Sequence, residues 1–421
     1  MRTHFDLAIL NAGELLTLSG ASLVPKRGAS MYELGLIPKG AVGISKGKIT
    51  WIGRHKQFRR AYTARHEIDA GGGVVLPGFI DPHTHAVFAG SREAEWLQKM
   101  RGLVPYLDIL KKGGGILSTV EHTRAASAKT LFESAKIILS KMLAQGTTTV
   151  EIKSGYGLTL TQEQKILDVI QRLKKTLPMD VVPTYLGAHV LPKTAQDDRS
   201  AYVREVIDSL PKMKPAAAFC DVFCEDGAFT ASEAAEIFTA AKAAGVQVQL
   251  HAGHFSDLGG IGLADRFQAV SIDHLDVIRK KDIPVLARSG SIAVLLPGVS
   301  HFLNSKKHAP ARALIDGGVP VALATDFNPG SSPCLSMQEI IHLAVLKLKM
   351  TPAEAISAAT INAAHALGLS GWTGSLELGK QADLIILDVE HYEQLPYYFG
   401  VNHVNTVIKN GRVVYSEQGR R

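Results

Sequence analysis

The sequence predicts an α/β protein, a (β/α)8 TIM-like barrel with a small β-sandwich domain formed by both termini. Two observations carry this prediction. In the middle of the chain, eight short apolar runs of strand character alternate with helical segments, which is the signature of βα units. Residues 1–72 and 371–421 instead contain short strands with Gly-rich turns, including a hairpin-like "NG" near the C-terminus. We therefore assign those two ranges to one composite β-domain and residues 73–370 to the barrel.

Each strand of the barrel is predicted from a run rich in β-branched residues and bounded by turn residues. Eight such units, each followed by a helix, suffice to close a parallel barrel. The strands are predicted at residues 73–81, 147–153, 180–188, 219–224, 246–250, 269–273, 291–296 and 319–325.

Helices between the strands are marked by periodicity and by capping signals. Apolar side chains recur at helical spacing from Leu131 to Met142, and Gly146 is expected to end that helix. The pairs Thr161–Gln164 and Thr230–Glu233 have the spacing of capping boxes. Thr351 with Pro352 and Glu354 predicts a further helix start, with proline in the first turn.

Composition and charge restrict the class of protein. No window approaches the roughly 20 apolar residues of a membrane span, and the N-terminus lacks signal-peptide features, so we expect a cytoplasmic protein without a membrane partner. The three cysteines form no CxxC pair and are expected to be free thiols. The net charge of +7 comes without a nucleic-acid-binding motif, so we expect no nucleic-acid partner. A mild positive bias suits a small anionic substrate.

The strongest local signal for chemistry is "DPHTH", which follows the first predicted barrel strand. At a strand end, the two-residue spacing of His83 and His85 places both imidazoles on one face. Further polar side chains follow the third, fifth, sixth and eighth predicted strands, and all of these strand ends face one mouth of a barrel. They are His189, His251, His274 and Asp326.

Three of these histidines together with Asp326 would suit one divalent metal, zinc or iron, with an open position for water. A second metal would need a bridging group on the fourth strand, where "FCDVFCED" offers no lysine and only Glu225 and Asp226 as carboxylates. We therefore expect a single cation, with this carboxylate bridge as the alternative.

The predicted cation site points to a hydrolase. A bound metal lowers the pKa of a water molecule and polarises a carbonyl. Asp326 is placed to take the proton of that water, and His274 is placed to hold or polarise the electrophilic oxygen. The glycines at 113–115 fit either a flexible loop or a lid over the mouth.

Several longer stretches resemble the metal-dependent amidohydrolase superfamily and, within it, the imidazolonepropionase family. The resemblance runs over nearly the whole chain. The stretches are "PGFIDPHTH" (77–85), "DPHTHAVFAGSREAEW" (81–96), "EIKSGYGL" (151–158), "TYLGAHVLP" (184–192) and "ATDFNPGSSPCLSM" (324–337).

The resemblance implies hydrolysis of 4-imidazolone-5-propanoate to N-formimidoyl-L-glutamate in histidine degradation, in the cytoplasm and by a homodimer. The implied metal ligands are His83, His85, His251 and Asp326. The implied substrate contacts are Arg92, Tyr156, His189, Asn328, Gly330 and Ser331. These residue types fit a small anionic heterocycle, since a guanidinium can hold the propanoate by two hydrogen bonds.

One position departs from the family pattern. The family usually has glutamate three residues after the fifth-strand histidine, and this chain has His254 in the sequence "LHAGHF". Histidine can move a proton but does not supply the negative charge of a glutamate near a cation. We expect His254 to serve in proton transfer or substrate contact. A fourth histidine ligand and a bystander role remain open for it.

The departure also leaves two other functions open. One is a divergent amidohydrolase or deaminase that acts on a related heterocycle. The other is a metal-binding pseudoenzyme.

Overall fold

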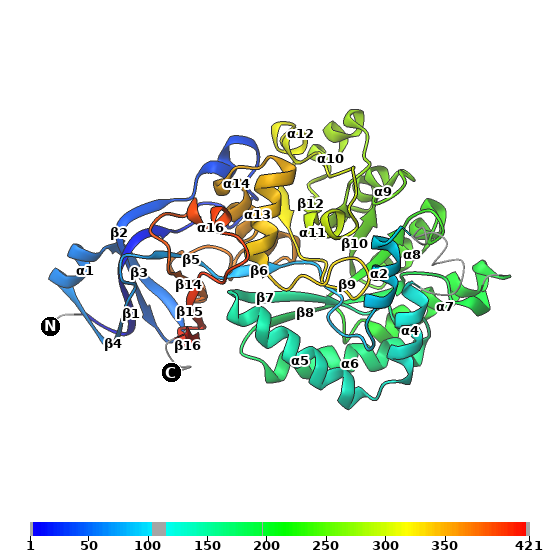
Figure 1. Ribbon diagram of the computed structural model, residues 1–421, viewed down its shortest axis with the longest axis horizontal. Coiled ribbons are helices and arrows are strands. Elements are labelled where there is room, and N and C mark those ends of the chain that lie inside the picture. The colour runs from blue at the N-terminus through cyan, green and yellow to red at the C-terminus, as the bar shows by residue number, and fades with distance from the viewer. Residues whose placement is uncertain (1–2, 103–114, 196, 418–421) are drawn as a thin grey trace.

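The computed structural model describes residues 3–102, 115–195 and 197–417, and it contains two separate sheets. Figure 1 shows the two bodies side by side, with the N- and C-terminal segments together at one end and the helix-covered strands at the other. The glycines at 113 and 114 lie outside the described residues, whereas Gly115 precedes a helix. No helix of the described residues is long and apolar enough to cross a membrane.

One of the two eight-stranded sheets is a parallel barrel in which neighbouring strands follow the order of the chain. Its ends close through backbone hydrogen bonds between the segments after the first and last strands, from Asp326 N to His83 O at 3.0 Å and from His85 N to Phe327 O at 2.9 Å. The strands are β6 (Phe79–Asp81), β7 (Thr147–Lys153), β8 (Asp180–Ala188), β9 (Phe219–Cys224), β10 (Gln247–Ala252), β11 (Ser271–His274), β12 (Ile292–Leu295) and β13 (Val321–Leu323).

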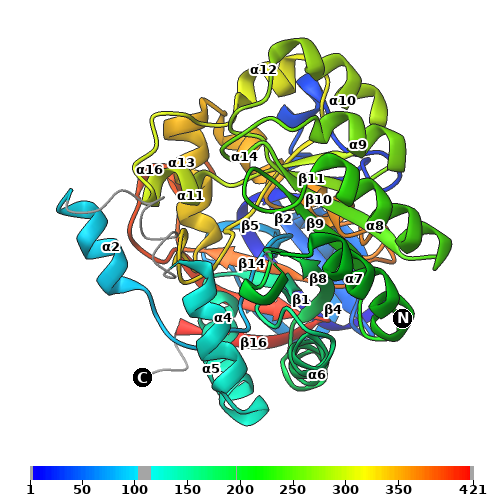
Figure 2. The same cartoon turned by 90° about the vertical axis from the view of Figure 1, so that its right-hand side faces the viewer.

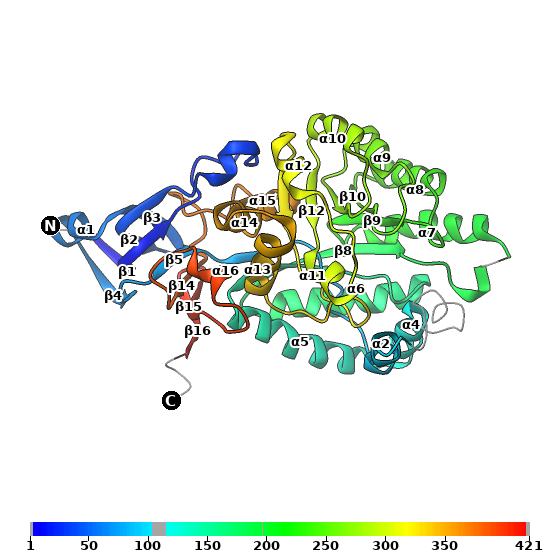
Figure 3. The same ribbon diagram turned by 45° about the horizontal axis from the view of Figure 1, so that its top comes forward.

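Helices surround the barrel, as Figures 2 and 3 show from two directions. The helices are α2 (Glu93–Met100), α4 (Ile116–Ala125), α5 (Ala128–Ala144), α6 (Leu160–Thr176), α7 (Arg199–Met213), α8 (Ala231–Ala243), α9 (Gly260–Phe267), α10 (Ile283–Ser289), α11 (Pro297–Phe302), α12 (Ala311–Asp316), α13 (Met337–Leu348), α14 (Pro352–Ala358) and α15 (Ile361–Ala366). The short helices α1 (His55–Ala61) and α16 (Gln394–Tyr397) belong to the terminal segments.

The capping box predicted at Thr230 and the helix start predicted at Thr351 are confirmed, since each hydroxyl accepts from the backbone N–H of the glutamate three residues on. The box predicted at Thr161 is wrong. Helix α6 begins earlier, with Thr159 as its N-cap, because the Thr159 hydroxyl already accepts the Gln162 backbone N–H.

The second sheet joins both termini in the strand order β16-β15-β14-β5-β1-β2-β3, with β4 paired to β1. The prediction of a small β-domain built from both ends of the chain is therefore confirmed. Its strands are β1 (Thr3–Leu16), β2 (Leu36–Ser45), β3 (Lys48–Arg54), β4 (Tyr62–Asp69), β5 (Val74–Pro77), β14 (Leu384–Leu387), β15 (Val404–Lys409) and β16 (Arg412–Ser416).

The run 73–81, predicted as one strand, is divided between the two sheets at Gly78. Strand β5 pairs with β14 and β1 in the terminal sheet, whereas β6 pairs with β7 in the barrel. A Cβ atom on Gly78 would lie 2.3 Å from the side chain of Thr148. Glycine is therefore required where the chain passes from one sheet to the other.

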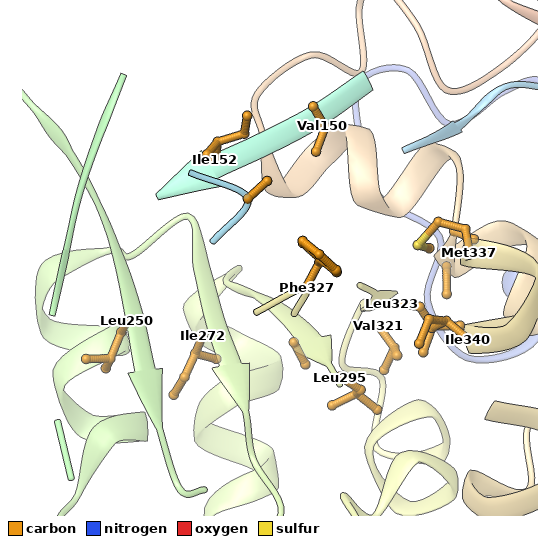
Figure 4. Close-up of a cluster of buried hydrophobic side chains, with 14 of the residues drawn as sticks. Val150, Ile152, Leu250, Ile272, Leu295, Val321, Leu323, Phe327, Met337 and Ile340 are labelled. Carbon is orange, nitrogen blue, oxygen red and sulfur yellow. The ribbon is translucent and has the colours of Figure 1, made fainter. Parts of the chain in front are cut away.

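The main core lies between the barrel strands and the helices. In Figure 4, Val150 and Ile152 of β7, Leu250 of β10 and Ile340 of α13 belong to one cluster of buried hydrophobic side chains. Because strand side chains alternate, residues 149, 151 and 153 of β7 occupy the opposite face from Val150 and Ile152. Those three side chains are polar and fully buried, so the barrel interior beneath the mouth is unusually polar.

Candidate metal centre and substrate pocket

Four of the predicted ligands lie together at the mouth of the barrel. His83 and His85 follow β6, His251 lies in β10 and Asp326 follows β13, and all four side chains are buried. The Nε2 atoms of His83 and His85 each lie 3.5 Å from Asp326 Oδ1. The rings of His83 and His251 are 4.4 Å apart between centroids. The ligand atoms of His83, His85 and His251 lie within 4.8 Å of one another.

The hydrogen bonding of these side chains fits a cation. His83 Nε2, His251 Nε2 and Asp326 Oδ1 are buried and have no hydrogen-bond partner among the described residues. Buried polar atoms in proteins are normally paired, so atoms left unpaired and converging on one point require an explanation. Two imidazole nitrogens and a carboxylate oxygen are donors that suit a divalent transition metal. The residues present therefore fit one divalent cation.

Two residues of this mouth have left-handed backbone conformations, with φ of 49° at Asp326 and 79° at His274. Such values are uncommon for residues with a side chain, and they cluster at functional sites. Burial raises the pKa of Asp326 well above its ordinary value, and its side-chain hydrogen bond with Asn328 opposes that rise only in part. A carboxyl group in this setting readily accepts a proton.

A cavity beside the cation site contains most of the predicted substrate contacts. Among the predicted site residues, only His83 and Gly330 do not line it, and Gly330 lies against the Arg92 guanidinium. The lining consists of His85, Arg92, Ile116, Tyr156, His189, Phe223, His251, His254, Phe255, His274, Asp326, Asn328 and Ser331.

His189 and Tyr156 form one wall of this cavity. The His189 ring stacks on that of His85 at 5.0 Å between centroids, and Tyr156 lies 5.5 Å from His189. His189 Nδ1 faces the Gly155 carbonyl oxygen at 3.0 Å and so carries the hydrogen. Burial lowers the pKa of His189 to about 3, so the imidazole is neutral, and its Nε2 is left as an acceptor.

Arg92 also lines the cavity, and Gly330 leaves room for its guanidinium. Its Nε donates to Glu95 at 2.9 Å. A Cβ atom on Gly330 would lie 1.9 Å from Arg92 Nη1. The glycine therefore fixes the position of a guanidinium directed at the cavity.

The Asn328 side chain organises the loop after β13. Its Oδ1 accepts from the backbone N–H groups of Gly330 and Ser331, both at 2.8 Å. Its Nδ2 donates to the Asp326 carbonyl oxygen at 2.7 Å. Asn328 therefore acts on the loop that presents Asp326 and Ser331, in addition to lining the cavity.

His254 lies between two other rings. Its centroid is 4.2 Å from that of His274 with an interplanar angle of 9°, and 3.7 Å from that of Phe255 with an angle of 23°. Burial, together with the charge of His251, lowers the pKa of His254 to about 3. His254, His274 and Asp276 form a second group of possible ligand atoms within 4.8 Å of one another, and it shares His274 with a group that contains His83 and Asp326. Because the two imidazole planes are parallel, their lone pairs do not converge on one cation.

Glu225, the alternative bridging ligand, is used elsewhere. Its Oε2 accepts from the Phe255 backbone N–H at 3.0 Å, and its Oε1 accepts from the Ser256 hydroxyl. It therefore holds the turn that carries His254. The groups of candidate ligand atoms found among the described residues include neither Glu225 nor Asp226.

Three buried charged residues next to the ligand histidines are not among the residues predicted from the sequence: Lys153, Asp221 and Asp273. Asp273 Oδ2 lies 2.7 Å from His83 Nδ1, and Asp221 Oδ2 lies 2.9 Å from His251 Nδ1. Both carboxylates lie close to Lys153, which is fully buried. A signal was present for the two carboxylates, since Asp221 and Asp273 each stand beside apolar residues in a buried strand.

The fold and the site define the class of the protein. A model of the amidohydrolase family matches residues 74–414. Among solved structures, an adenosine deaminase from Xanthomonas campestris with bound zinc has a TM-score of 0.75 at 19% identity, covering 99% of this chain and 94% of that one. The guanine deaminase of E. coli has a TM-score of 0.71 at 17% identity, covering 97% and 99%. These two likenesses show the fold alone.

Relatives of similar sequence show which family of amidohydrolases the chain belongs to. An imidazolonepropionase from Geobacillus kaustophilus is 47% identical over 418 residues, 98% of each chain. Another from Bacillus cereus is 45% identical over 413 residues, 98% of this chain and 97% of that one. This chain therefore belongs to the imidazolonepropionase family of the amidohydrolases.

Proposed function

We propose that the protein hydrolyses 4-imidazolone-5-propanoate to N-formimidoyl-L-glutamate. Near-identical length and 47% identity to an imidazolonepropionase support this activity. The single observation in the structure that carries it is the cavity in which Arg92, Tyr156 and His189 face the cation site. The reaction adds one water across the ring C–N bond next to the carbonyl, so the carbonyl becomes a carboxylate and the ring nitrogen leaves as an amidine N–H.

His83, His85, His251 and Asp326 would hold one divalent cation, zinc or iron, and no further side chain is needed for it. When bound, the cation activates a water molecule and polarises the ring carbonyl. Metal analysis of the purified protein decides between zinc and iron, because imidazole and carboxylate donors suit both.

The remaining side chains orient the substrate. The Arg92 guanidinium pairs with the propanoate, and Gly330 gives it room. Tyr156 and the neutral His189 bond the polar edge of the ring, with His189 Nε2 as acceptor. Ser331 offers a hydroxyl from the loop that Asn328 organises.

Asp326 moves the proton. Its buried carboxylate takes a proton from the attacking water and passes it to the leaving ring nitrogen. His274 holds the carbonyl oxygen as negative charge develops there. His254, stacked on His274, holds that ring in place and serves as a neutral proton acceptor at the cavity wall.

A panel of substrates tests the activity. We expect the metal-loaded protein to convert 4-imidazolone-5-propanoate to formimidoylglutamate, and to release no ammonia from guanine or adenosine. Ammonia release from either purine, with no ring opening of the imidazolone, would favour a deaminase instead. Metal binding without any turnover would favour a pseudoenzyme. We also propose a homodimer that works in the cytoplasm, and light scattering of the purified protein tests the dimer.

A further inference from the structure

A buried ion cluster lies behind the cation site, inside the barrel. Lys153, at the end of β7, is fully buried. Its Nζ lies 2.8 Å from Asp221, 3.0 Å from Glu151 and 3.8 Å from Asp273. It also donates to Gln249 Oε1 at 3.2 Å. Lys153 does not line the substrate cavity, so any role in catalysis must pass through its neighbours.

Two of those neighbours connect Lys153 to the cation ligands. The Asp221 oxygen that faces Lys153 is also the one 2.9 Å from His251 Nδ1. In the same way, the Asp273 oxygen nearest Lys153 faces His83 Nδ1 at 2.7 Å. Of the three carboxylates beside this ammonium, two therefore each lie against a different histidine.

The carboxylates determine which ring nitrogen is available to a cation. A ring nitrogen that faces a carboxylate carries the hydrogen, which leaves the other nitrogen with its lone pair. In both His83 and His251 that other nitrogen is Nε2. Both Nε2 atoms are buried and have no hydrogen-bond partner among the described residues. The Asp273–His83 contact is a hydrogen bond, whereas the Asp221–His251 contact has the distance of an ion pair without hydrogen-bond geometry.

Lys153 supplies the charge that lets the two carboxylates lie side by side. Asp221 and Asp273 belong to β9 and β11, which flank β10 and its His251. Both are fully buried, and two buried anions without a cation beside them are strongly disfavoured. Lys153 is the cation in contact with both.

We propose that Lys153 is a positioning residue, which acts through Asp221 and Asp273 to hold the rings of His251 and His83 in the tautomer and orientation that bind the cation. This inference rests on the cation site of the proposed function and not on its substrate. Failure of the ring-opening assay would therefore leave it standing, provided that the cation binds.

The test is a titration of the metal-free protein with Co²⁺, followed by the d–d absorption of the bound ion. We expect Lys153→Met, which keeps the length of the side chain but removes its charge, to weaken Co²⁺ binding by about 10- to 100-fold. We also expect an altered absorption spectrum, because the ligand rings would no longer be held. If Lys153 were only a positive charge near the site, its removal would instead strengthen binding.

Lys409 provides the matched control. It is also a buried lysine, with Nζ 2.6 Å from both Asp180 and Asp383, but it lies in β15 of the terminal sheet. Lys409→Met should lower the melting temperature while leaving the Co²⁺ affinity and spectrum unchanged. A purely structural role of Lys153 predicts the same result for both variants.

Asp221→Asn and Asp273→Asn are a second pair of test variants, because asparagine has nearly the shape of aspartate but carries no charge. Each should weaken Co²⁺ binding, and the effect of Lys153→Met should be much smaller in the Asp221→Asn background than alone, since the residues act in one chain. If Lys153→Met does not fold, the Co²⁺ affinities of the two asparagine variants test the proposal. Unchanged or tighter Co²⁺ binding in the folded variants would overturn the proposal.

Discussion

At the scale of single residues, the site depends on groups whose surroundings fix what each can do. At position 254 the resemblance to the family leads us to expect a glutamate, and this chain has a histidine. A flat imidazole can stack between His274 and Phe255, as it does here. A glutamate could not make these ring contacts.

The first prediction concerns His254→Gln. Glutamine is polar and similar in size but cannot exchange a proton, so we expect kcat to fall by about 100-fold with a smaller change in KM. His254→Glu, which keeps a proton acceptor, should retain more activity than the glutamine variant. Steady-state kinetics with the metal content verified make the comparison. Wild-type kinetics in His254→Gln would show that the histidine is a bystander.

The second prediction concerns Gly330→Ala. The new Cβ would overlap Arg92 Nη1 and push the guanidinium away from the cavity. Displacement of a positioning group by about 1 Å can lower kcat/KM by roughly 100-fold, and we expect most of this loss in KM for the anionic substrate. Gly262→Ala is the control, because apart from its chain neighbours and the backbone of its own helix, no atom of the described residues lies within 4 Å of the new methyl group. Equal KM values for the two variants would argue against Arg92 as the propanoate contact.

Residue by residue, the sequence predicted the ends of the strands better than their interiors. His83, His85, His251 and Asp326, which the structure brings together, could be proposed as ligands because they stand at the ends of apolar runs that are easy to recognise. Lys153 and Asp221 were not predicted, because the partners of a charged residue in a buried strand are known only once the neighbouring strands are placed.

At the scale of elements, alternation and turn residues located the barrel strands. The bounds of β7, β8 and β9 agree with the predicted ranges, since each run is apolar and ends at a clear break. The division of 73–81 between two sheets could not be predicted. Both halves are buried and apolar, so only the packing of Gly78 against Thr148 shows the change of sheet.

The third prediction belongs to the turn after β10. Glu225, just after β9, holds this turn through Phe255 and Ser256. We expect Glu225→Gln to lower kcat/KM by about tenfold, near 1.4 kcal/mol, because one charged hydrogen bond to the turn is weakened while the cation ligands stay in place. Asp226→Asn is the control, since Asp226 is exposed. A loss of bound metal in Glu225→Gln would instead indicate a bridging ligand.

At the scale of the whole molecule, the closed barrel brings together residues from distant parts of the chain. Its buried lysine is paired with carboxylates, and burial favours the neutral form of its histidines. The family relationship and the two-body architecture were predictable from motifs that run along the whole sequence. The relative placement of the charged groups inside the barrel depends on strand register, which only the structure supplies.

The fourth prediction concerns pH. The pKa of His254 is lowered from 6.5 to about 3 on folding, so the unfolded chain binds the proton more readily. The stabilising contribution of the neutral ring is complete above pH 6.5 and is lost as the pH falls from there toward 3. For each proton taken up on unfolding, the free energy of unfolding falls by about 1.4 kcal/mol per pH unit as the pH is lowered in this window.

His254→Gln should therefore show a shallower fall in the free energy of unfolding between these pH values than the wild type. Denaturant unfolding at a series of pH values, with metal-free protein throughout, measures the two slopes. Parallel slopes would mean that the His254 pKa is the same in the folded and unfolded chains.

The central claim is that this barrel opens an imidazolone ring by adding water. The most direct measurement is the product formed from 4-imidazolone-5-propanoate in ¹⁸O-labelled water by the metal-loaded protein. Hydrolysis at the carbonyl predicts formimidoylglutamate with one ¹⁸O in its new carboxylate, no ammonia, and no product from Asp326→Asn. Recovery of unchanged substrate, or release of ammonia with the ring intact, would contradict the claim.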